Sequence, residues 1–412
     1  MSNIKSDFLK IIYDRGFVNQ ITDLSNLDKL LLKQGMTAYI GFDCTAPSLH
    51  VGSLIQIMML RWFQKTGHRP IILVGGGTTK IGDPSGKDEA RPILSSEIIN
   101  KNKLSIKKLF SRYLKFGSDD KKAILIDNED WLNEINYISF LREYGSLFSI
   151  NKMLTLESLK ARLDREQNLS FLEFNYPIFQ AYDFLKLNEK YKCILQMGGS
   201  DQWGNIVNGI ELIRKKNAKQ TFGITSPLLT TSSGSKMGKS ENGAIWLDEE
   251  MLSNYDFWQF WRNTEDGDVI KFLKLFTELD LSEINKLENL TGSDINEAKI
   301  ILANEVTKLC RGKEAASKSA EIALDTFSNA KINENLPLFE ITEENISIID
   351  ALKLSKFSNS RGEARRLIRG KGAKLNDKVV INEEEIISKK IYKNDKIKIS
   401  AGKKRHALIT FK

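Results

Sequence analysis

Cysteine, histidine and long apolar runs are scarce in this 412-residue chain, and each scarcity excludes a class of protein. The cysteines, Cys44, Cys193 and Cys310, are far apart and odd in number, which indicates neither a disulfide framework nor a zinc knuckle. With only three histidines, we expect no multi-histidine metal site. No run approaches the roughly 20 apolar residues of a membrane span, and the first residues show no signal-peptide or transit-peptide pattern. We therefore expect a cytoplasmic protein with no membrane partner and no bound metal.

Positive charge is concentrated near the C-terminal end of the sequence. Residues 341–412 contain 18 lysines and arginines against 9 aspartates and glutamates, whereas the remainder of the chain is almost neutral. A compact basic segment beside a neutral body is the electrostatic footprint of a nucleic-acid-binding module. The alternative is a basic face that only increases solubility.

The pattern within this basic segment predicts a folded module. Arg361, Arg365 and Arg369 share one face of a predicted helix, and a hairpin pattern follows over 373–381. The lysine and isoleucine alternation over 396–399 is typical of an edge strand.

Continuous apolar runs separated by helical patterns predict the fold of the first part of the chain. The runs Ile71–Val74, Ala123–Ile126 and Cys193–Met197 are each closed by glycine or aspartate, as expected for strands buried on both faces. We therefore predict an α/β protein with a doubly wound, Rossmann-like parallel sheet, whose ligands lie beyond the carboxyl ends of the strands. The Gly82–Lys87 segment is not a Walker A loop, because only three residues separate its glycines.

Two lysines three residues apart characterise the polar segment Thr231–Gly243. Met237 is its only large apolar side chain, so we expect a mobile loop that cannot bury itself and that presents Lys236 and Lys239. Paired ammonium groups suit a transition state in which phosphate charge accumulates. Taken alone, the segment could equally be a solvated basic turn.

A second segment, Pro47–Ser53, lies where a β-prone run gives way to a helical period. His50 and Gly52 therefore fall at a helix N-terminus, where free backbone N–H groups and the helix dipole favour an anion. Gly52 leaves room for close approach of a ligand. Taken singly, His50 could be a structural histidine.

A polar stripe runs along an otherwise apolar helix predicted from Pro177 to Lys186. Tyr176, Gln180 and Asp183 are spaced i, i+4 and i+7, so they share one face. A buried aspartate is costly without a hydrogen-bonding partner. The stripe either joins an internal network that links helix and sheet or faces a polar ligand.

Together, the histidine and lysine segments resemble the paired signatures of class I aminoacyl-tRNA synthetases, usually written HIGH and KMSKS. The likeness extends to the bacterial-type tyrosyl-tRNA synthetase family and covers essentially the whole chain. The further segments that carry it, in the family's order and spacing, are Tyr39–Asp43, Gly82–Lys87, Tyr176–Asp183 and Gln196–Asn205.

The resemblance implies four regions. They are a Rossmann-like catalytic domain over 1–230, the signature loop with a small α-helical anticodon-arm domain over 231–328, a linker over 329–345, and a basic α+β RNA-binding module over 346–412.

The resemblance also implies roles for individual residues. The tyrosine substrate is expected to contact Tyr39 and Asp183 through its phenol, Asp83, Tyr176 and Gln180 through its ammonium group, and Gln202 near its carboxylate. ATP is expected to bind Asp43, His50, Gly52, Ser53, Asp201 and Lys239. The expected catalytic residues around the phosphates and the leaving pyrophosphate are Thr45, His50, Lys87, Arg91, Lys236, Lys239 and Ser240. The expected tRNA contacts are Arg361, Arg365, Arg366, Arg369 and Lys371.

The implied reaction joins L-tyrosine to tRNA(Tyr) through a tyrosyl-adenylate, with no covalent enzyme intermediate. Mg-ATP is a substrate, no cofactor is bound permanently, and members of the family are homodimers. Ser53 stands where HIGH often has a second histidine, and Gly238 replaces the usual serine of KMSKS, which we expect to add mobility.

Two alternatives remain at this point. A tryptophanyl-tRNA synthetase would share the fold and the chemistry but would not need the Tyr39 and Asp183 pair. The other alternative is an RNA-binding protein that has lost catalysis and keeps only the basic module.

Overall fold

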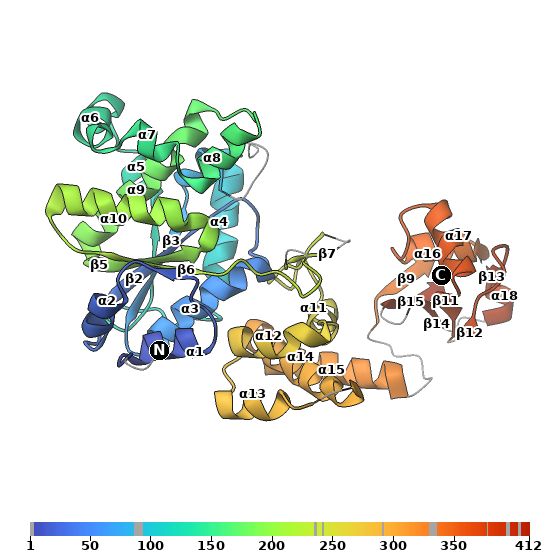
Figure 1. The fold of residues 1–412 in the computed structure, drawn as a ribbon. Helices are drawn as coiled ribbons and strands as arrows, with labels where there is room; N and C mark the ends of the chain where they lie inside the picture. Colours follow the sequence, from blue (N-terminus) through green and yellow to red (C-terminus); the bar gives the residue numbers. More distant parts are fainter. Residues whose placement is uncertain are drawn as a thin grey trace. The chain divides into compact units, whose positions relative to one another are not determined.

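The chain forms two units in its computed structural model (Figure 1). The structure describes residues 4–85, 94–234, 237–240, 243–290, 292–328, 336–376, 378–392, 396–402 and 405–412. One unit comprises Met1–Ser253 and Phe260–Arg311, and the other comprises Asn254–Gln259 and Gly312–Lys412. The finer domain limits expected from the sequence remain predictions. Among the residues described, no helix has the length and apolarity needed to cross a membrane.

A six-stranded sheet forms the centre of the first unit. The strands are β1 (Gln20–Ile21), β2 (Thr37–Asp43), β3 (Arg69–Gly75), β4 (Ile124–Asp127), β5 (Cys193–Gly199) and β6 (Phe222–Ser226). Their order is β1-β6-β5-β2-β3-β4, and all neighbours are parallel except β1 and β6. The chain order reverses between β2 and β5, as in doubly wound sheets. The predicted strands correspond to β3, β4 and β5, and the predicted fold class is confirmed.

Helices cover both faces of this sheet (Figure 1). On one side lie α9 (Phe171–Tyr191) and α10 (Trp203–Asn217), and on the other lie α1 (Asp7–Asp14) and α3 (Leu54–Lys65). Successive side chains of a strand point to opposite faces, so β2 contributes to both cores. Its Tyr39 packs against Phe184 of α9 (Phe171–Tyr191), with ring centroids 5.3 Å apart. Its Phe42 packs against Phe110 of α4 (Ser96–Phe110), with ring centroids 4.9 Å apart.

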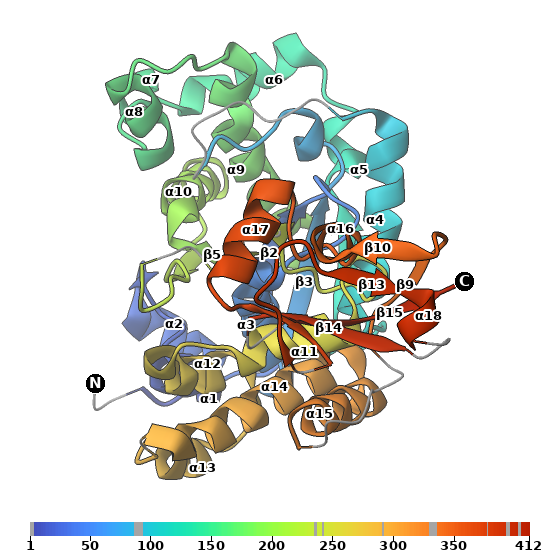
Figure 2. The same ribbon diagram turned by 90° about the vertical axis from the view of Figure 1, so that its right-hand side faces the viewer.

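The other helices around the sheet are shorter on average. They are α1 (Asp7–Asp14), α2 (Leu24–Leu31), α3 (Leu54–Lys65), α5 (Glu129–Leu132), α6 (Tyr137–Glu143), α7 (Ile150–Met153), α8 (Glu157–Asp164) and α10 (Trp203–Asn217). Single 3₁₀ turns lie at η1 (Val51–Ser53), η2 (Thr78–Lys80), η3 (Gly145–Leu147) and η4 (Ser200–Gln202). In both views α6, α7 and α8 gather at one end of the unit (Figures 1 and 2).

Helix α9 begins six residues before the predicted start at Pro177. The Ser170 hydroxyl accepts a hydrogen bond from the Glu173 amide, and the Glu173 carboxylate accepts one from the Ser170 amide. This reciprocal capping box fixes the helix start. Pro177 therefore lies inside the helix and not in its first turn, which corrects the predicted boundary.

A hairpin and further helices follow the sheet. They are β7 (Lys239–Ser240), β8 (Gly243–Ala244), α11 (Asn254–Arg262), η5 (Asp266–Asp268), α12 (Val269–Phe276), α13 (Leu281–Leu287), η6 (Gly292–Asp294), α14 (Ile295–Arg311) and α15 (Lys313–Ser328). Arg15 joins α12 to the sheet domain, because its guanidinium donates to the carbonyls of Lys274 and Thr277 at 3.0 Å. The same group lies 4.4 Å from the centre of the Trp62 ring.

The basic module in the second unit has its own sheet and hydrophobic core. Its five-stranded sheet has the order β12-β11-β14-β15-β9, and β10 pairs with β13. Its elements are β9 (Leu338–Ile341), β10 (Asn345–Ser347), α16 (Ile348–Leu354), α17 (Arg361–Arg369), β11 (Ala373–Leu375), β12 (Lys378–Val379), β13 (Ile386–Ser388), α18 (Lys389–Tyr392), β14 (Ile397–Ala401) and β15 (Arg405–Phe411).

The predicted arginine helix and the predicted hairpin are confirmed as α17 and as the β11–β12 pair. The edge-strand prediction is wrong, because β14 lies between β11 and β15 and is buried along its length. β15 follows β14 directly in the chain, but β11 lies well before it, so a local alternation of lysine and isoleucine could not reveal that β14 is paired on both sides.

Candidate active site

A cavity of about 550 Å³ lies at the carboxyl ends of β2, β3 and β5 in the first unit. This is the place where the strand order reverses, at which doubly wound sheets bind their ligands. The expected site residues that line it are Tyr39, Asp43, Thr45, His50, Gly52, Ser53, Asp83, Tyr176, Gln180, Asp183, Asp201 and Gln202. The fold therefore brings together residues that are up to 163 positions apart, from Tyr39 to Gln202.

One part of the cavity combines a buried hydroxyl with a buried carboxylate. Tyr39 is 1% exposed and Asp183 is 2% exposed. The Asp183 carboxylate accepts hydrogen bonds from Asn128 Nδ2 at 2.9 Å and from Trp131 Nε1 at 2.7 Å. Among the described residues, the Tyr39 hydroxyl has no hydrogen-bond partner. Because buried polar groups are normally hydrogen-bonded, this hydroxyl marks a place for a polar atom of a ligand.

A second carboxylate, that of Asp83, is also held by hydrogen bonds. It accepts from the Ser85 amide and from Gln202 Nε2, each at 2.9 Å. Asn205 Nδ2 donates to Gln180 Oε1 at 2.9 Å and to Gln202 Oε1 at 3.2 Å, so the two glutamines are fixed from the same side. The arrangement is a set of oriented oxygens suited to an ammonium group.

Asp43 connects the two halves of the cavity. Its carboxylate accepts hydrogen bonds from the Tyr176 hydroxyl at 3.0 Å and from the Thr78 hydroxyl at 2.8 Å. Thr78 also accepts from Asn128, so the Asp43 and Asp183 carboxylates belong to one hydrogen-bonded system.

Burial dominates the electrostatics of this system. It raises the pKa of Asp183 to about 7 against the hydrogen bonds from Asn128 and Trp131, and the charge of Asp43 raises it further. Burial also raises the pKa of Asp83 to about 6, again with a contribution from Asp43. The pKa of Tyr39 is raised by burial and then by Asp183, which keeps its hydroxyl protonated as a donor.

The turn into α3 forms another part of the cavity wall. His50 Nδ1 accepts a hydrogen bond from the Gly52 amide at 3.0 Å, so this ring nitrogen is unprotonated there. A Cβ atom on Gly52 would lie 2.6 Å from His50 Cε1, which explains why only glycine fits. The turn precedes the N-terminus of α3, a position that favours anions.

Residues that follow the second signature segment pair with this turn. The Val51 amide donates to the Ile245 carbonyl at 2.9 Å, and the Leu247 amide donates to the Leu49 carbonyl at 2.9 Å. Trp246 lines the cavity as well, and its ring centroid lies 6.4 Å from that of His50.

The signature segment itself is only partly described. Met237 is 7% exposed, so the prediction that this segment cannot bury itself is wrong at that residue. Lys87, Arg91 and Lys236 lie outside the described residues, as do the side chains of Lys239 and Ser240. Their expected roles remain predictions.

Sequence reasoning missed three residues that shape the cavity. Asn128 and Trp131 hold Asp183, and the side-chain oxygen of Gln196 is buried in the cavity wall with no partner among the described residues. The available signal for Asn128 was its place directly after β4, where polar residues of a parallel sheet meet ligands.

The expected tRNA contacts lie on one exposed helix of the basic module. Arg361, Arg365, Arg366 and Arg369 belong to α17, and Lys371 follows it. Three of these arginines already face carboxylates. Arg361 pairs with Asp350 at 2.9 Å, and Arg369 and Arg365 pair with Glu383 at 2.5 Å and 3.7 Å.

Comparison with known proteins agrees with this geometry. The family described as tRNA synthetases class I (W and Y) matches residues 32–328. Curated proteins named tyrosine–tRNA ligase from Novosphingobium aromaticivorans and Brucella abortus are each 54% identical to this chain, over 99% of both sequences.

Solved structures extend the likeness to the fold. A C-terminally truncated mitochondrial tyrosyl-tRNA synthetase from Aspergillus nidulans is 30% identical, with a TM-score of 0.70 over 78% of this chain and 95% of that one. A tryptophanyl-tRNA synthetase from Encephalitozoon cuniculi shares the fold at a TM-score of 0.56, with 14% identity over 80% of this chain and 95% of its own. The chain thus belongs to the bacterial-type tyrosyl-tRNA synthetase family of class I aminoacyl-tRNA synthetases.

Proposed function

We propose that this protein joins L-tyrosine to tRNA(Tyr) at the expense of ATP. Tyrosine and ATP first give tyrosyl-adenylate and pyrophosphate, and the adenylate then charges the tRNA with release of AMP. One observation carries this proposal. A single cavity contains a buried hydroxyl and carboxylate that can bind a phenol, and also a turn that can bind an anion. Tyr39 and Asp183 provide the pair, and the His50–Gly52 segment provides the turn.

The phenol of tyrosine is expected to donate to the Asp183 carboxylate and to accept from the Tyr39 hydroxyl. Phenylalanine would leave the Tyr39 hydroxyl without a partner and would deprive the Asp183 carboxylate of one hydrogen bond. Tyrosyl-tRNA synthetases are themselves the standard example of such discrimination. The substrate ammonium group fits beside Asp83, Tyr176 and Gln180, which line the same cavity.

ATP is expected to extend from the carboxyl end of β5 to the turn before α3. Asp201 follows β5 and suits the ribose hydroxyls, and Asp43 lies at the end of β2. The cavity is lined near the helix N-terminus by Thr45, His50, Gly52 and Ser53. Phosphate oxygens can accept hydrogen bonds from backbone N–H groups there.

The chemical step requires no nucleophile from the protein. The carboxylate of tyrosine is ionised at neutral pH and attacks the α-phosphorus of ATP, and pyrophosphate leaves from the opposite side. We expect catalysis to consist of positioning and charge stabilisation, with magnesium entering as part of the ATP substrate. The cationic groups proposed for the phosphates are Lys87, Arg91, Lys236 and Lys239, together with the hydroxyl of Ser240.

The basic module is proposed to bind the tRNA backbone. Its exposed arginine helix, α17, carries four of the five predicted contacts, and positive side chains contribute most of the sequence-independent affinity for nucleic acids. A terminal ribose hydroxyl of the bound tRNA then attacks the adenylate. A protein that acts on tRNA and ATP is consistent with the cytoplasmic location expected from the sequence.

A homodimer is also proposed, and an exposed apolar surface supports it. Large apolar side chains project from α6 to α9, namely Tyr137, Ile138, Leu141, Ile150, Leu154, Leu163, Phe171 and Leu172. A buried ion pair between Arg162 and Glu173 holds α8 against the start of α9, two of the helices that carry this surface. Contiguous exposed apolar surface commonly marks a protein interface, and a second copy of this chain is the proposed occupant.

Amino-acid-dependent ATP–pyrophosphate exchange tests the proposed function directly. With all twenty amino acids supplied separately, exchange is expected only with tyrosine. Exchange with tryptophan would favour the alternative family member, and absence of any exchange would favour an RNA-binding protein without catalysis. Transfer of labelled tyrosine to tRNA from the preformed adenylate then tests the second step.

A further inference from the structure

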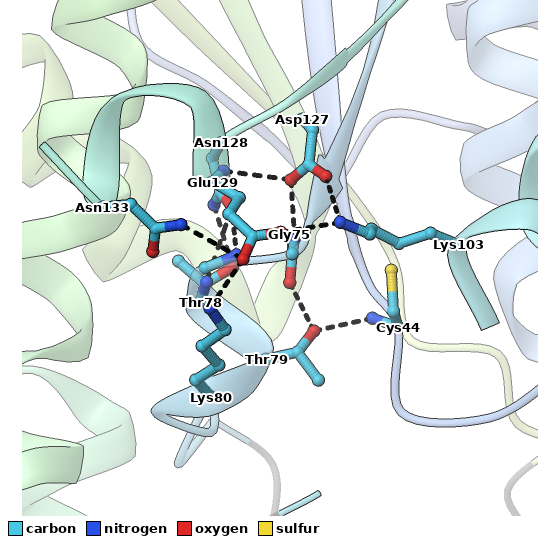
Figure 3. Close-up of polar contacts among 12 residues, drawn as sticks. Cys44, Gly75, Thr78, Thr79, Lys80, Lys103, Asp127, Asn128, Glu129 and Asn133 are labelled. Atoms are coloured by element: carbon cyan, nitrogen blue, oxygen red, sulfur yellow. Dashed lines mark hydrogen bonds and ion pairs between the residues drawn. The ribbon is translucent and has the colours of Figure 1, made fainter. Parts of the chain in front are cut away.

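Four charged side chains, Lys80, Lys103, Asp127 and Glu129, form a cluster beside Asn128 (Figure 3), which donates a hydrogen bond to Asp183. Lys103 of α4 contacts Asp127 Oδ2 and Glu129 Oε2, each at 2.7 Å. Lys80 contacts the other Glu129 oxygen at 2.6 Å. The two acidic residues therefore share one lysine, and that lysine comes from a helix distant in sequence. The mechanism proposed above makes no use of this cluster.

The cluster encloses Asn128, because Asp127 and Glu129 are its two neighbours in the chain. Asp127 Oδ1 accepts from the Gly76 amide at 3.1 Å and from the Glu129 amide at 3.0 Å, which folds the turn against the end of β3. Asn128 Oδ1 accepts from the Gly77 amide at 2.8 Å. The same amide group points its Nδ2 at Asp183.

Without a cation, two carboxylates on adjacent sides of one turn would repel each other and open it. Contacts with Lys103 first, and with Lys80 second, lower the pKa of Glu129 to about 2. The acidic partners in turn outweigh the effect of burial and raise the pKa of Lys103. The Asp127 charge also disfavours ionisation of Asp183, so a cation beside Asp127 favours the ionised acceptor.

We propose that Lys103 is a positioning residue for amino-acid specificity. By holding the two acidic flanks of Asn128, it fixes the hydrogen bond that orients the Asp183 carboxylate toward a tyrosine phenol. This inference rests on the proposed role of Asp183 as the phenol acceptor. Lys103 is not one of the residues that line the cavity, and its effect passes through Asn128.

The test compares tyrosine and phenylalanine as substrates in pyrophosphate exchange. Lys103→Met is expected to lower the tyrosine to phenylalanine ratio of kcat/KM by about 10-fold, the scale of one misaligned hydrogen bond to a charged group. The loss is expected in the KM for tyrosine and not in kcat, because the phenol contact is the same in the ground and transition states. Lys103→Arg keeps the cation and is expected to retain most of the discrimination.

The matched control is Lys107→Met, which removes an exposed lysine from the same helix. It is expected to leave both substrates unaffected. If Lys103→Met does not fold, as judged by circular dichroism, Glu129→Gln replaces it. That variant keeps the side-chain shape and weakens the contact between Glu129 and Lys103. It is expected to lower the tyrosine to phenylalanine ratio of kcat/KM several-fold.

Asp183→Asn separates the inference from the proposed function. If Asp183→Asn abolishes discrimination while the ratio for Lys103→Met, or for its replacement Glu129→Gln, equals that of the wild type, the role of Lys103 is refuted and the phenol site stands. If Asp183→Asn leaves the ratio unchanged, the phenol site itself is wrong, and the inference is overturned with it. A loss in kcat alone after Lys103→Met would also contradict a positioning role.

Discussion

At the scale of single residues, the cavity places several carboxylates where burial opposes their charge. Asp83 and Asp183 are both buried, so each holds a proton more tightly than an exposed aspartate. A substrate ammonium group supplies the missing positive charge. Binding and ionisation are therefore coupled in this site.

The first prediction follows from this coupling. The pKa of Asp83 is raised to about 6, so the free protein carries a neutral Asp83 at pH 5 and an ionised one at pH 7.5. Since the ammonium group prefers the ionised form, tyrosine affinity is expected to be about 10-fold weaker at pH 5 than at pH 7.5. Asp183, with its pKa at about 7, acts in the same direction. Calorimetric titration with tyrosine measures this, and an affinity that does not change with pH would contradict it.

Gly238 provides a second prediction at this scale. Its φ is +103°, and a Cβ atom there would lie 3.1 Å from both the Gly52 nitrogen and His50 Nδ1. Gly243 is a matched control, because its φ is +107° but no atom of the described residues lies within 4 Å of such a Cβ. Both alanine variants are strained, but only Gly238→Ala pushes the two signature segments apart.

We expect Gly238→Ala to slow pyrophosphate release by at least about 10-fold more than Gly243→Ala, because displaced phosphate contacts act on the transition state. Tyrosine affinity is expected to be unchanged in both. Rapid-quench measurement of the first turnover distinguishes the two variants. Equal rates would show that contact with the His50 turn has no part in catalysis, and that glycine serves only mobility, as the sequence suggested.

At the scale of elements, the arginines of α17 that are proposed to bind tRNA also form ion pairs within the protein. Its arginines face outward, but Asp350 and Glu383 occupy guanidinium donors that a phosphate would use. Glu383 is the shared acceptor, since it pairs with both Arg365 and Arg369. Exposed ion pairs are weak, so RNA can displace them at small cost.

Glu383→Gln is therefore expected to raise tRNA affinity about 3-fold at moderate salt, within the range of one exposed ion pair. Glu384→Gln is the matched control, because Glu384 and Glu383 line the same surface pocket beside the arginines of α17. Filter binding over a series of salt concentrations measures both variants. The proposal for α17 fails if the two variants raise affinity equally or if neither changes it.

Individual elements also show which site residues could be predicted from the sequence and which could not. Asp43 and Asp201 were predicted from the family resemblance, and the structure places Asp43 at the end of β2 and Asp201 after β5, at the edge where the carboxyl ends of parallel strands meet. Asn128 and Trp131 lie on or beside the four-residue helix α5, which is too short to show a period. Their bonds to Asp183 join positions 55 and 52 residues apart, so only the packing of α9 reveals them.

The polar stripe of α9 illustrates the same limit. The sequence left two readings of Asp183 open, an internal network or a ligand contact. The structure places this carboxylate in a network with Asn128 and Trp131 and also in the cavity wall, so the readings are not exclusive. A helical period identifies the face that a residue shares but not the groups that it meets.

At the scale of the whole molecule, the proposed dimer can be tested with two equally exposed residues. Ile138 on α6 is 71% exposed and Leu104 on α4 is 72% exposed, so substitution of either residue leaves the hydrophobic core intact. Ile138→Asp is expected to produce a monomer, because an unpaired charge in an apolar interface is costly. Leu104→Asp is expected to remain a dimer. Sedimentation velocity measures both, and the surface is misassigned if Ile138→Asp sediments as the wild-type dimer does.

The central claim is that one cavity holds the phenol of tyrosine and the phosphates of ATP in a single geometry. A crystal structure of the protein with L-tyrosine and a non-hydrolysable ATP analogue tests it most directly. The account predicts the phenol oxygen within hydrogen-bond distance of the Tyr39 hydroxyl and the Asp183 carboxylate, with phosphate oxygens at the His50–Gly52 turn. A tyrosine ring bound away from Tyr39 and Asp183 would contradict it.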